Sequence, residues 1–202
     1  MTQTSLSALA VSGGFQDPVL GSQDAFRAVM DAFAAPGTIA RLAAPVEAPA
    51  PLAPAAAVFL LTLADADASI FLEGAEAGAA AAWLGFHTGA SLVAAPGEAA
   101  FALLTLGSDP AGWGRFGIGT DAYPDRAATL ILPVESLEGG ASLLLSGPGI
   151  ETVRPIAPQG LPAGFLAARA GNRALFPRGH DLVLVAGEGL IALPRSTRIA
   201  EA

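Results

Sequence analysis

Two reactive side chains are missing from this chain of 202 residues: it has no cysteine, and all ten of its basic residues are arginine. Without thiols the chain cannot form a disulfide, a cysteine nucleophile, a Cys-ligated zinc site or an iron–sulfur cluster. Without lysine it cannot form a Schiff base with pyridoxal phosphate, nor supply the lysine of a Walker A phosphate loop. Two large classes of mechanism are therefore excluded.

Charged residues are also scarce, at 14% of the chain against 52% hydrophobic residues. This balance is typical of a folded protein, and the length favours one domain with a sizeable core. The 18 acidic and 10 basic residues give a net charge of −8, which argues against a nucleic-acid partner because phosphate neutralisation needs a basic face. Because charged residues are so few, we also expect part of the surface to be apolar and to be covered by another copy of the chain or by another subunit.

The N-terminal sequence has neither the basic flank nor the long apolar run of a signal peptide. The longest uncharged stretches, residues 48–64 and 77–97, contain proline, glycine or histidine and are poor membrane spans. We therefore expect a cytoplasmic protein without membrane contact. We also expect residues 1–21 to form a mobile arm that precedes one α/β domain over residues 22–202.

Helical and strand patterns alternate in the first half of the chain, and strands dominate from residue 127 onward. A helix is predicted behind an N-cap at residues 22–24, with an apolar stripe of Phe26, Val29, Met30 and Phe33 facing the core. Further helices are expected at residues 55–63, 75–86 and 162–172. Strands are expected at 38–42, 69–72, 92–93, 99–106, 128–134, 141–146, 151–156, 181–186 and 190–193.

The three strands between residues 128 and 156 are separated by glycine-rich turns and are predicted to be antiparallel neighbours. The glycines at residues 187–189 predict a hairpin, and the irregular segment 107–124 is expected to hold one helical turn near Pro110. Together these patterns predict an α/β fold with three layers, a mixed β-sheet with helices on both faces.

Two loops are suited to bind an anion. Gly147 and Gly149 follow a predicted strand, where backbone N–H groups could approach a phosphate, although a tight turn between strands is the alternative. The segment 194–198 offers two guanidinium groups and two hydroxyls, and Arg195 and Thr197 are its candidate phosphate or carboxylate ligands. The same loop could equally hold a partner subunit.

Catalytic candidates are few, because His87 and His180 are the only imidazoles. His87 ends a predicted helix, where it can act as an acid or base or simply bond the terminal carbonyls. Histidine and carboxylate residues form no local ligand pair, so we expect no metal. Residues 112–117 spell GxGxxG, but the glycines and proline that follow leave no room for the helix of a dinucleotide site, so we expect no cofactor.

Eight segments in one order resemble the H subunits of the bacterial carbon–phosphorus lyase complex, the PhnH family of phosphonate metabolism. The resemblance covers most of the chain between Gln23 and Arg198. The segments are Ala25-Phe26-Arg27 with Met30 and Pro36-Gly37, Leu60 to Asp65, Phe86-His87-Thr88, Gly119-Thr120 with Pro124, Ala128 to Leu132, Gly147 to Ile150, Phe176-Pro177 with Gly179 and Asp181, and Leu193 to Thr197.

This resemblance implies an α/β sandwich similar to the pyridoxal-phosphate-dependent transferases but without the cofactor or its lysine. It also implies a homodimer when isolated, which joins the G, I and J subunits. With the G, I and L proteins, the H subunit is implied to take part in forming α-D-ribose 1-methylphosphonate 5-triphosphate from ATP and methylphosphonate. In that reaction adenine is displaced, and the J subunit later breaks the carbon–phosphorus bond.

We therefore expect an accessory subunit of this transferase and lyase system, not catalytic alone, that helps to hold ATP or the ribose triphosphate. The candidate ligand-binding residues are Gly147, Gly149, Arg195 and Thr197. One alternative is a self-sufficient phosphate-binding transferase with His87 as acid or base and Arg195 as phosphate clamp. The other alternative is a pure assembly scaffold without a ligand.

Overall fold

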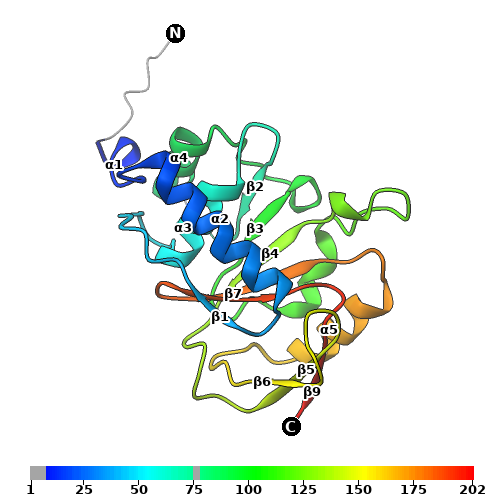
Figure 1. Cartoon of the computed structure of the whole chain (residues 1–202). Coiled ribbons are helices and arrows are strands. Elements are labelled where there is room, and N and C mark those ends of the chain that lie inside the picture. The colour runs from blue at the N-terminus through cyan, green and yellow to red at the C-terminus, as the bar shows by residue number, and fades with distance from the viewer. Residues whose placement is uncertain (1–7, 75–77) are drawn as a thin grey trace.

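A six-stranded mixed sheet runs through the middle of the molecule (Figure 1). The computed structural model describes residues 8–74 and 78–202. Four neighbouring strands are parallel, and the two remaining strands are joined to each other and to these four by antiparallel pairing, which confirms an α/β fold with a mixed sheet. The order across the sheet is β1 (Ile39–Arg41), β8 (Gly189–Leu193), β7 (Asp181–Ala186), β4 (Thr129–Pro133), β3 (Phe101–Leu103) and β2 (Ile70–Leu72).

Three helices cover one face of this sheet: α2 (Pro18–Ala34), α3 (Pro54–Leu63) and α4 (Gly78–Thr88). The sequence of α3 is apolar all round, and its residues 55–60 are all buried because α3 contacts α2, α4 and β7. From the strands, Ile131, Val183 and Val185 pack into the same core. This side of the molecule is held by apolar packing.

The opposite face is covered partly by a second, three-stranded sheet and partly by helix. The sheet has the order β6 (Arg154–Ile156), β5 (Leu143–Ser146), β9 (Arg198–Glu201). Beside it lie α5 (Phe165–Ala174) and the 3₁₀ helix η2 (Pro110–Arg115), the latter at the predicted helical turn. Leu130, Leu132, Leu182 and Leu184, which alternate with the residues of the other face, pack into this second core. The predicted helical layer on this face is thus shared with strands.

The chain enters the helical layer earlier than predicted. The short helix α1 (Ala8–Val11) packs against α4, and α2 begins at Pro18 instead of behind residues 22–24. Asp17 is the N-cap, since its Oδ1 accepts hydrogen bonds from the main-chain N of Val19 and Leu20 at 3.0 Å. Residues 8–21 of the predicted mobile arm therefore include helix, and residues 1–7 lie outside the described residues.

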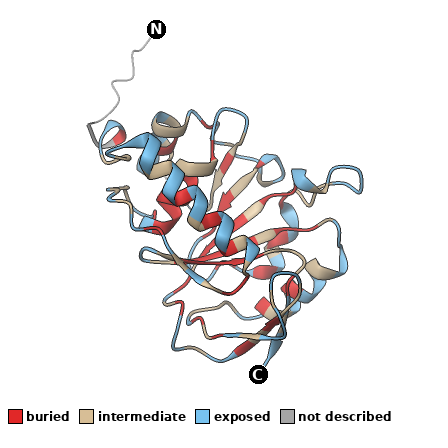
Figure 2. Cartoon of the chain, viewed as in Figure 1, coloured by how far each residue is buried: buried red, intermediate tan, exposed pale blue. Residues whose placement is uncertain are grey.

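Small residues, not the large apolar ones, form the buried stripe of α2. Ala25, Val29 and Ala32 are buried, whereas Phe26 is 49% and Met30 40% exposed, so the predicted core position of these last two is wrong. The buried side of α2 is therefore rotated relative to the predicted stripe, and Phe33 is only partly buried against the same core. Figure 2 shows the outer side of α2 as a largely exposed surface in front of buried strands.

The strand pairings confirm the predicted hairpin and two of the three strands that were expected to be antiparallel neighbours. β7 and β8 form the predicted hairpin, and β5 and β6 are antiparallel neighbours as expected. β4, however, belongs to the large sheet between the parallel strands β3 and β7, because its continuous apolar run is buried on both faces. The final strand β9 was not predicted, and only an isolated bridge forms at Leu92.

The turn between β5 and β6 packs the small sheet against the end of α2. Gly149 has a φ of +80°, and a Cβ at this position would lie 2.1 Å from the carbonyl oxygen of Ala34. Nearby, Nη1 of Arg154 donates to the carbonyls of Ala35 and Pro36 at 2.9 and 2.7 Å. The close approach of the two backbones therefore requires glycine.

We expect Gly149→Ala to lower the free energy of unfolding by more than about 2 kcal/mol, because the clash with Ala34 adds to the strain of a left-handed backbone. Gly107→Ala is the matched control, since Gly107 has a φ of +76° with nothing within 4 Å of its Cβ position. That control should lose only the strain energy of roughly 1–2 kcal/mol. Urea denaturation measures both values, and equal losses would contradict the backbone contact.

Candidate functional site

The predicted ligand Arg195 lies in a charged cluster at the start of β7. Its Nη2 and Nε donate to Oδ2 and Oδ1 of Asp181 at 2.5 and 3.2 Å, and its main-chain N donates to Oδ1 at 2.7 Å. Its Nη1 donates to the carbonyl of Pro124. The two side chains are only 14% and 21% exposed. Anion binding by Arg195 remains a prediction, and it would require the pair with Asp181 to open.

The structure brings the two predicted loops together through their backbones. A Cβ at Gly147 would lie 3.1 Å from the carbonyl oxygen of Ser196 and 3.5 Å from Cα of Thr197. The side chain of Thr197 is buried, and its main-chain N donates to the carbonyl of Pro194 at 2.9 Å. Gly149 faces the end of α2 instead. The tight-turn interpretation explains the contacts of both glycines.

A further member of the cluster, Arg169 of α5, was missed by the sequence analysis. It is 4% exposed, and its Nη1 and Nη2 donate to the carbonyls of His180, Leu193 and Pro194 at 3.3, 3.2 and 2.9 Å. Burial lowers the pKa of Arg169 to about 10, against the opposing attraction of Asp181, so it stays cationic at neutral pH. Arg169 lies four residues after Phe165, so both side chains share one helix face, and this spacing could have indicated that Arg169 is buried.

His180 connects α5 to the loop that precedes β4. Its main-chain N donates to Oδ1 of Asn172 at 2.7 Å, and Nδ2 of Asn172 donates to its carbonyl at 3.0 Å. The ring Nε2 lies 3.2 Å from the carbonyl oxygen of Phe116, which requires a proton on Nε2. Burial is the main cause that lowers the pKa of His180, so its imidazole is neutral at neutral pH.

The other imidazole, His87, lies in the last turn of α4 within the helical layer. Its Nε2 is 3.3 Å from the carbonyl oxygen of Ser12, which also accepts a hydrogen bond from Nε1 of Trp83 at 2.7 Å. The rings of His87 and Trp83 have centroids 4.7 Å apart. These contacts hold the N-terminal segment on α4, and the structure does not bring His87 to Arg195.

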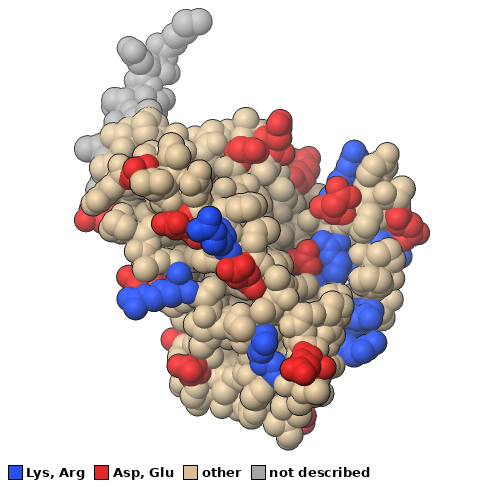
Figure 3. All heavy atoms as spheres, viewed as in Figure 1, with Lys and Arg blue, Asp and Glu red and all other residues tan. Residues whose placement is uncertain are grey.

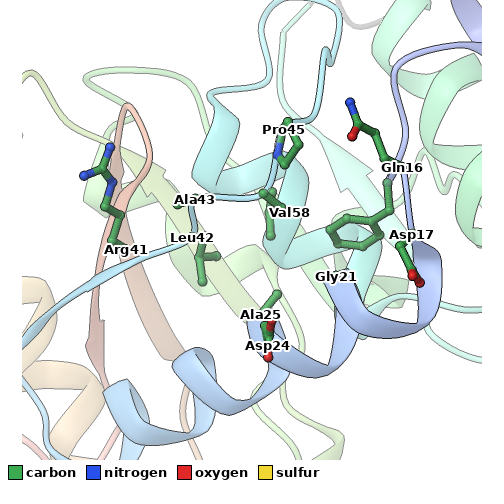
Figure 4. Close-up of a pocket in the computed structure, with 12 residues that line it drawn as sticks. Gln16, Asp17, Gly21, Asp24, Ala25, Arg41, Leu42, Ala43, Pro45 and Val58 are labelled. Carbon is green, nitrogen blue, oxygen red and sulfur yellow. The ribbon is translucent and has the colours of Figure 1, made fainter.

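A separate cavity of about 430 Å³ lies between the start of α2, α3 and the segment after β1 (Figure 4). Its apolar wall includes Ala25, Leu42 and Val58, all buried. Figure 4 shows Arg41 at one end of the cavity and Gln16 at the other.

Two of the four polar side chains that line this cavity are acidic. Asp17 caps α2, and Arg41 donates from Nε and Nη2 to Oε2 of Glu188 at 2.9 and 2.7 Å. Asp24 also lines the cavity, and its carboxylate has no hydrogen-bond partner among the residues that the structure describes. Two carboxylates and a paired arginine disfavour a polyphosphate here.

Charged side chains form small groups on the face in view in Figure 3, with wide uncharged areas between them and no continuous cationic surface. In the described ranges 8–74 and 78–202, no three histidine or carboxylate side chains are placed to hold a metal ion. Within those same ranges, no helix combines the length and apolar character needed to cross a membrane.

We expect Asp181→Asn to lower the free energy of unfolding by about 3 kcal/mol, because it leaves Arg195 mostly buried without a counter-charge. Glu188→Gln is the matched control, since it breaks the pair with Arg41, whose side chain is 75% exposed. Exposed pairs contribute only about 0–1 kcal/mol. Thermal and urea denaturation compare the two variants, and a loss no larger in Asp181→Asn than in the control would contradict a stabilising pair.

The amino-acid sequence of the chain is similar to known proteins along nearly its whole length. Residues 13–200 match the family model described as "Bacterial phosphonate metabolism protein (PhnH)". The chain is 47% identical over 189 residues to "Alpha-D-ribose 1-methylphosphonate 5-triphosphate synthase subunit PhnH" of Rhizobium meliloti (strain 1021), covering 93% of this chain and 94% of that protein. It is 35% identical over 82 residues to "Putative C-P lyase subunit protein HtxG" of Stutzerimonas stutzeri, 41% of this chain and 42% of the relative. The resemblance seen in the sequence is confirmed, and the chain belongs to the PhnH family of bacterial phosphonate metabolism proteins.

Proposed function

We propose that this chain is an accessory subunit of an α-D-ribose 1-methylphosphonate 5-triphosphate synthase in phosphonate catabolism. The observation that carries this proposal is the 47% identity to a subunit of that name, which extends over 93% of this chain and 94% of the relative. Because the similarity extends over nearly the full length of both proteins, it favours a shared role for the whole chain and not only a shared segment.

The use of the cationic side chains supports an accessory role. The side chains of Arg195, Arg169 and Arg154 donate to protein carbonyls or to Asp181. Arg115 pairs with Glu73. His87 and His180 each contact a main-chain carbonyl. The side chains best suited to chemistry therefore stabilise the fold.

The outer face of α2 supports association with other subunits. Val19, Leu20, Phe26 and Met30 are 64%, 60%, 49% and 40% exposed, and exposed apolar surface of this kind marks interaction sites. The partners we propose are the G, I and J subunits of the complex, with a second copy when the chain is isolated, all in the cytoplasm. A likeness to pyridoxal-phosphate-dependent transferases remains a prediction.

Binding of ATP or the ribose triphosphate at Gly147, Gly149, Arg195 and Thr197 also remains a prediction. It requires Arg195 to exchange Asp181 for phosphate. A pure scaffold is the second candidate function. The bidentate ion pair between Arg195 and Asp181 favours it, because Asp181 already supplies acceptors for the guanidinium of Arg195.

The accessory role is tested by mixing purified G, I and L proteins with ATP and methylphosphonate, with and without this chain, and measuring adenine release. We expect release only when the chain and its partners are combined, and none from the chain alone. The Glu188→Gln variant is the positive control, because its change is exposed and should leave assembly intact. Efficient release by the isolated chain, or equal release without it, would overturn the proposal.

A further inference from the structure

A second cavity, of about 180 Å³, lies between α5, η2 and the first residues of β4 and β7. Trp113, Leu130 and Leu182 form much of its wall, and all three are buried. Arg169 is the cationic residue on this wall. The cavity therefore combines an apolar interior with one guanidinium group.

One N–H donor of the Arg169 guanidinium is not hydrogen-bonded within the described part of the chain. Its Nη1 and Nη2 are bonded to main-chain carbonyls, which are neutral acceptors. Its Nε is buried and has no hydrogen-bond partner among the described residues. A buried donor without an acceptor is costly, and a charged one more so.

The surrounding side chains do not neutralise the positive charge of Arg169. Asp181 attracts it, but the same carboxylate accepts three hydrogen bonds from Arg195. Two guanidinium groups and one carboxylate leave a net charge of +1, and the neutral imidazole of His180 adds no negative charge. An anion in the cavity would supply the missing counter-charge.

We propose that this cavity binds a small organic anion with an apolar body. Its carboxylate or phosphonate group pairs with the guanidinium of Arg169, and its body packs against Trp113, Leu130 and Leu182. Bonds between a guanidinium and an acid group are charge-assisted and strong. Apolar cavities of about 150 Å³ hold benzene, so this one has room for a molecule the size of benzoate but not for a nucleotide.

Two glycines on the cavity wall allow the site to be filled without disturbing Arg169. A Cβ at Gly114 or Gly171 would have no atom within 4 Å, and neither glycine has a positive φ. Gly171 lies inside α5, where a leucine also favours the helix. Gly171 is exposed, but it shares its helix face with Ala168 and Leu175, which also line the cavity. We therefore expect Gly171→Leu to fold and to extend its side chain over the cavity.

Binding is measured by ¹⁵N NMR of the intact chain during titration with benzoate and, separately, phenylphosphonate. The indole N–H of Trp113 and the Nε–H of Arg169 should shift saturably with at least one of these probes. The indole of Trp83 lies in the other core and should not shift, which makes it an internal control. Benzoate alone indicates a carboxylate ligand, and phenylphosphonate alone a phosphonate.

The charge and the cavity are tested separately. Benzamide has the shape of benzoate without its charge, and we expect it to bind at least about tenfold more weakly. Gly171→Leu should weaken binding of the anion by a similar factor, and Arg169→Met, if it folds, should abolish it. The proposal is overturned if neither anion gives a saturable shift, if benzamide binds as tightly as the anion that does, or if Gly171→Leu binds that anion as well as the wild type.

Discussion

The guanidinium of Arg169 links α5 to the strand ends of the large sheet. Its acceptors are the carbonyl just before β7 and the two carbonyls at the end of β8 and just beyond it, so one side chain positions a helix against the last hairpin. The pair between Asp181 and Arg195 holds the loop that leads from the same hairpin to β9. The placement of α5, the loop and the small sheet therefore depends on charges that are buried together.

The two faces of the large sheet are thus stabilised by different physical effects. On the side of α2, α3 and α4, the close-packed small residues of α2 and the fully buried α3 provide mainly apolar contacts. On the other side, a desolvated cation must be compensated, and its three main-chain acceptors are neutral. This difference explains why Phe26 and Met30 can lie exposed on the outer face of α2 without loss of the core, while we expect the region around α5 to be sensitive to changes in charge.

Local patterns in the sequence predicted the parts of the fold that depend on local chemistry. The apolar run of α3, the β7–β8 hairpin and the helical turn near Pro110 were all evident. The start of α2 was signalled by Asp17 before Pro18, but Ser22 to Asp24 offered a competing cap. Long-range pairing was not predictable in this way: Asp181 and Arg195 are 14 residues apart and meet only because β7 and β8 fold back on each other. The same holds for the neighbours of β4, which the order of strands along the chain does not reveal.

Native-state hydrogen exchange of Arg169→Lys tests most directly whether the buried guanidinium positions α5. A lysine keeps the charge but cannot bond carbonyls on two strands with a planar fork. We predict that the amides of α5 lose protection in this variant, whereas those of α2 and α3 keep the protection of the wild type. Unchanged protection in α5 would contradict the account, because the helix would then be held by its apolar contacts alone.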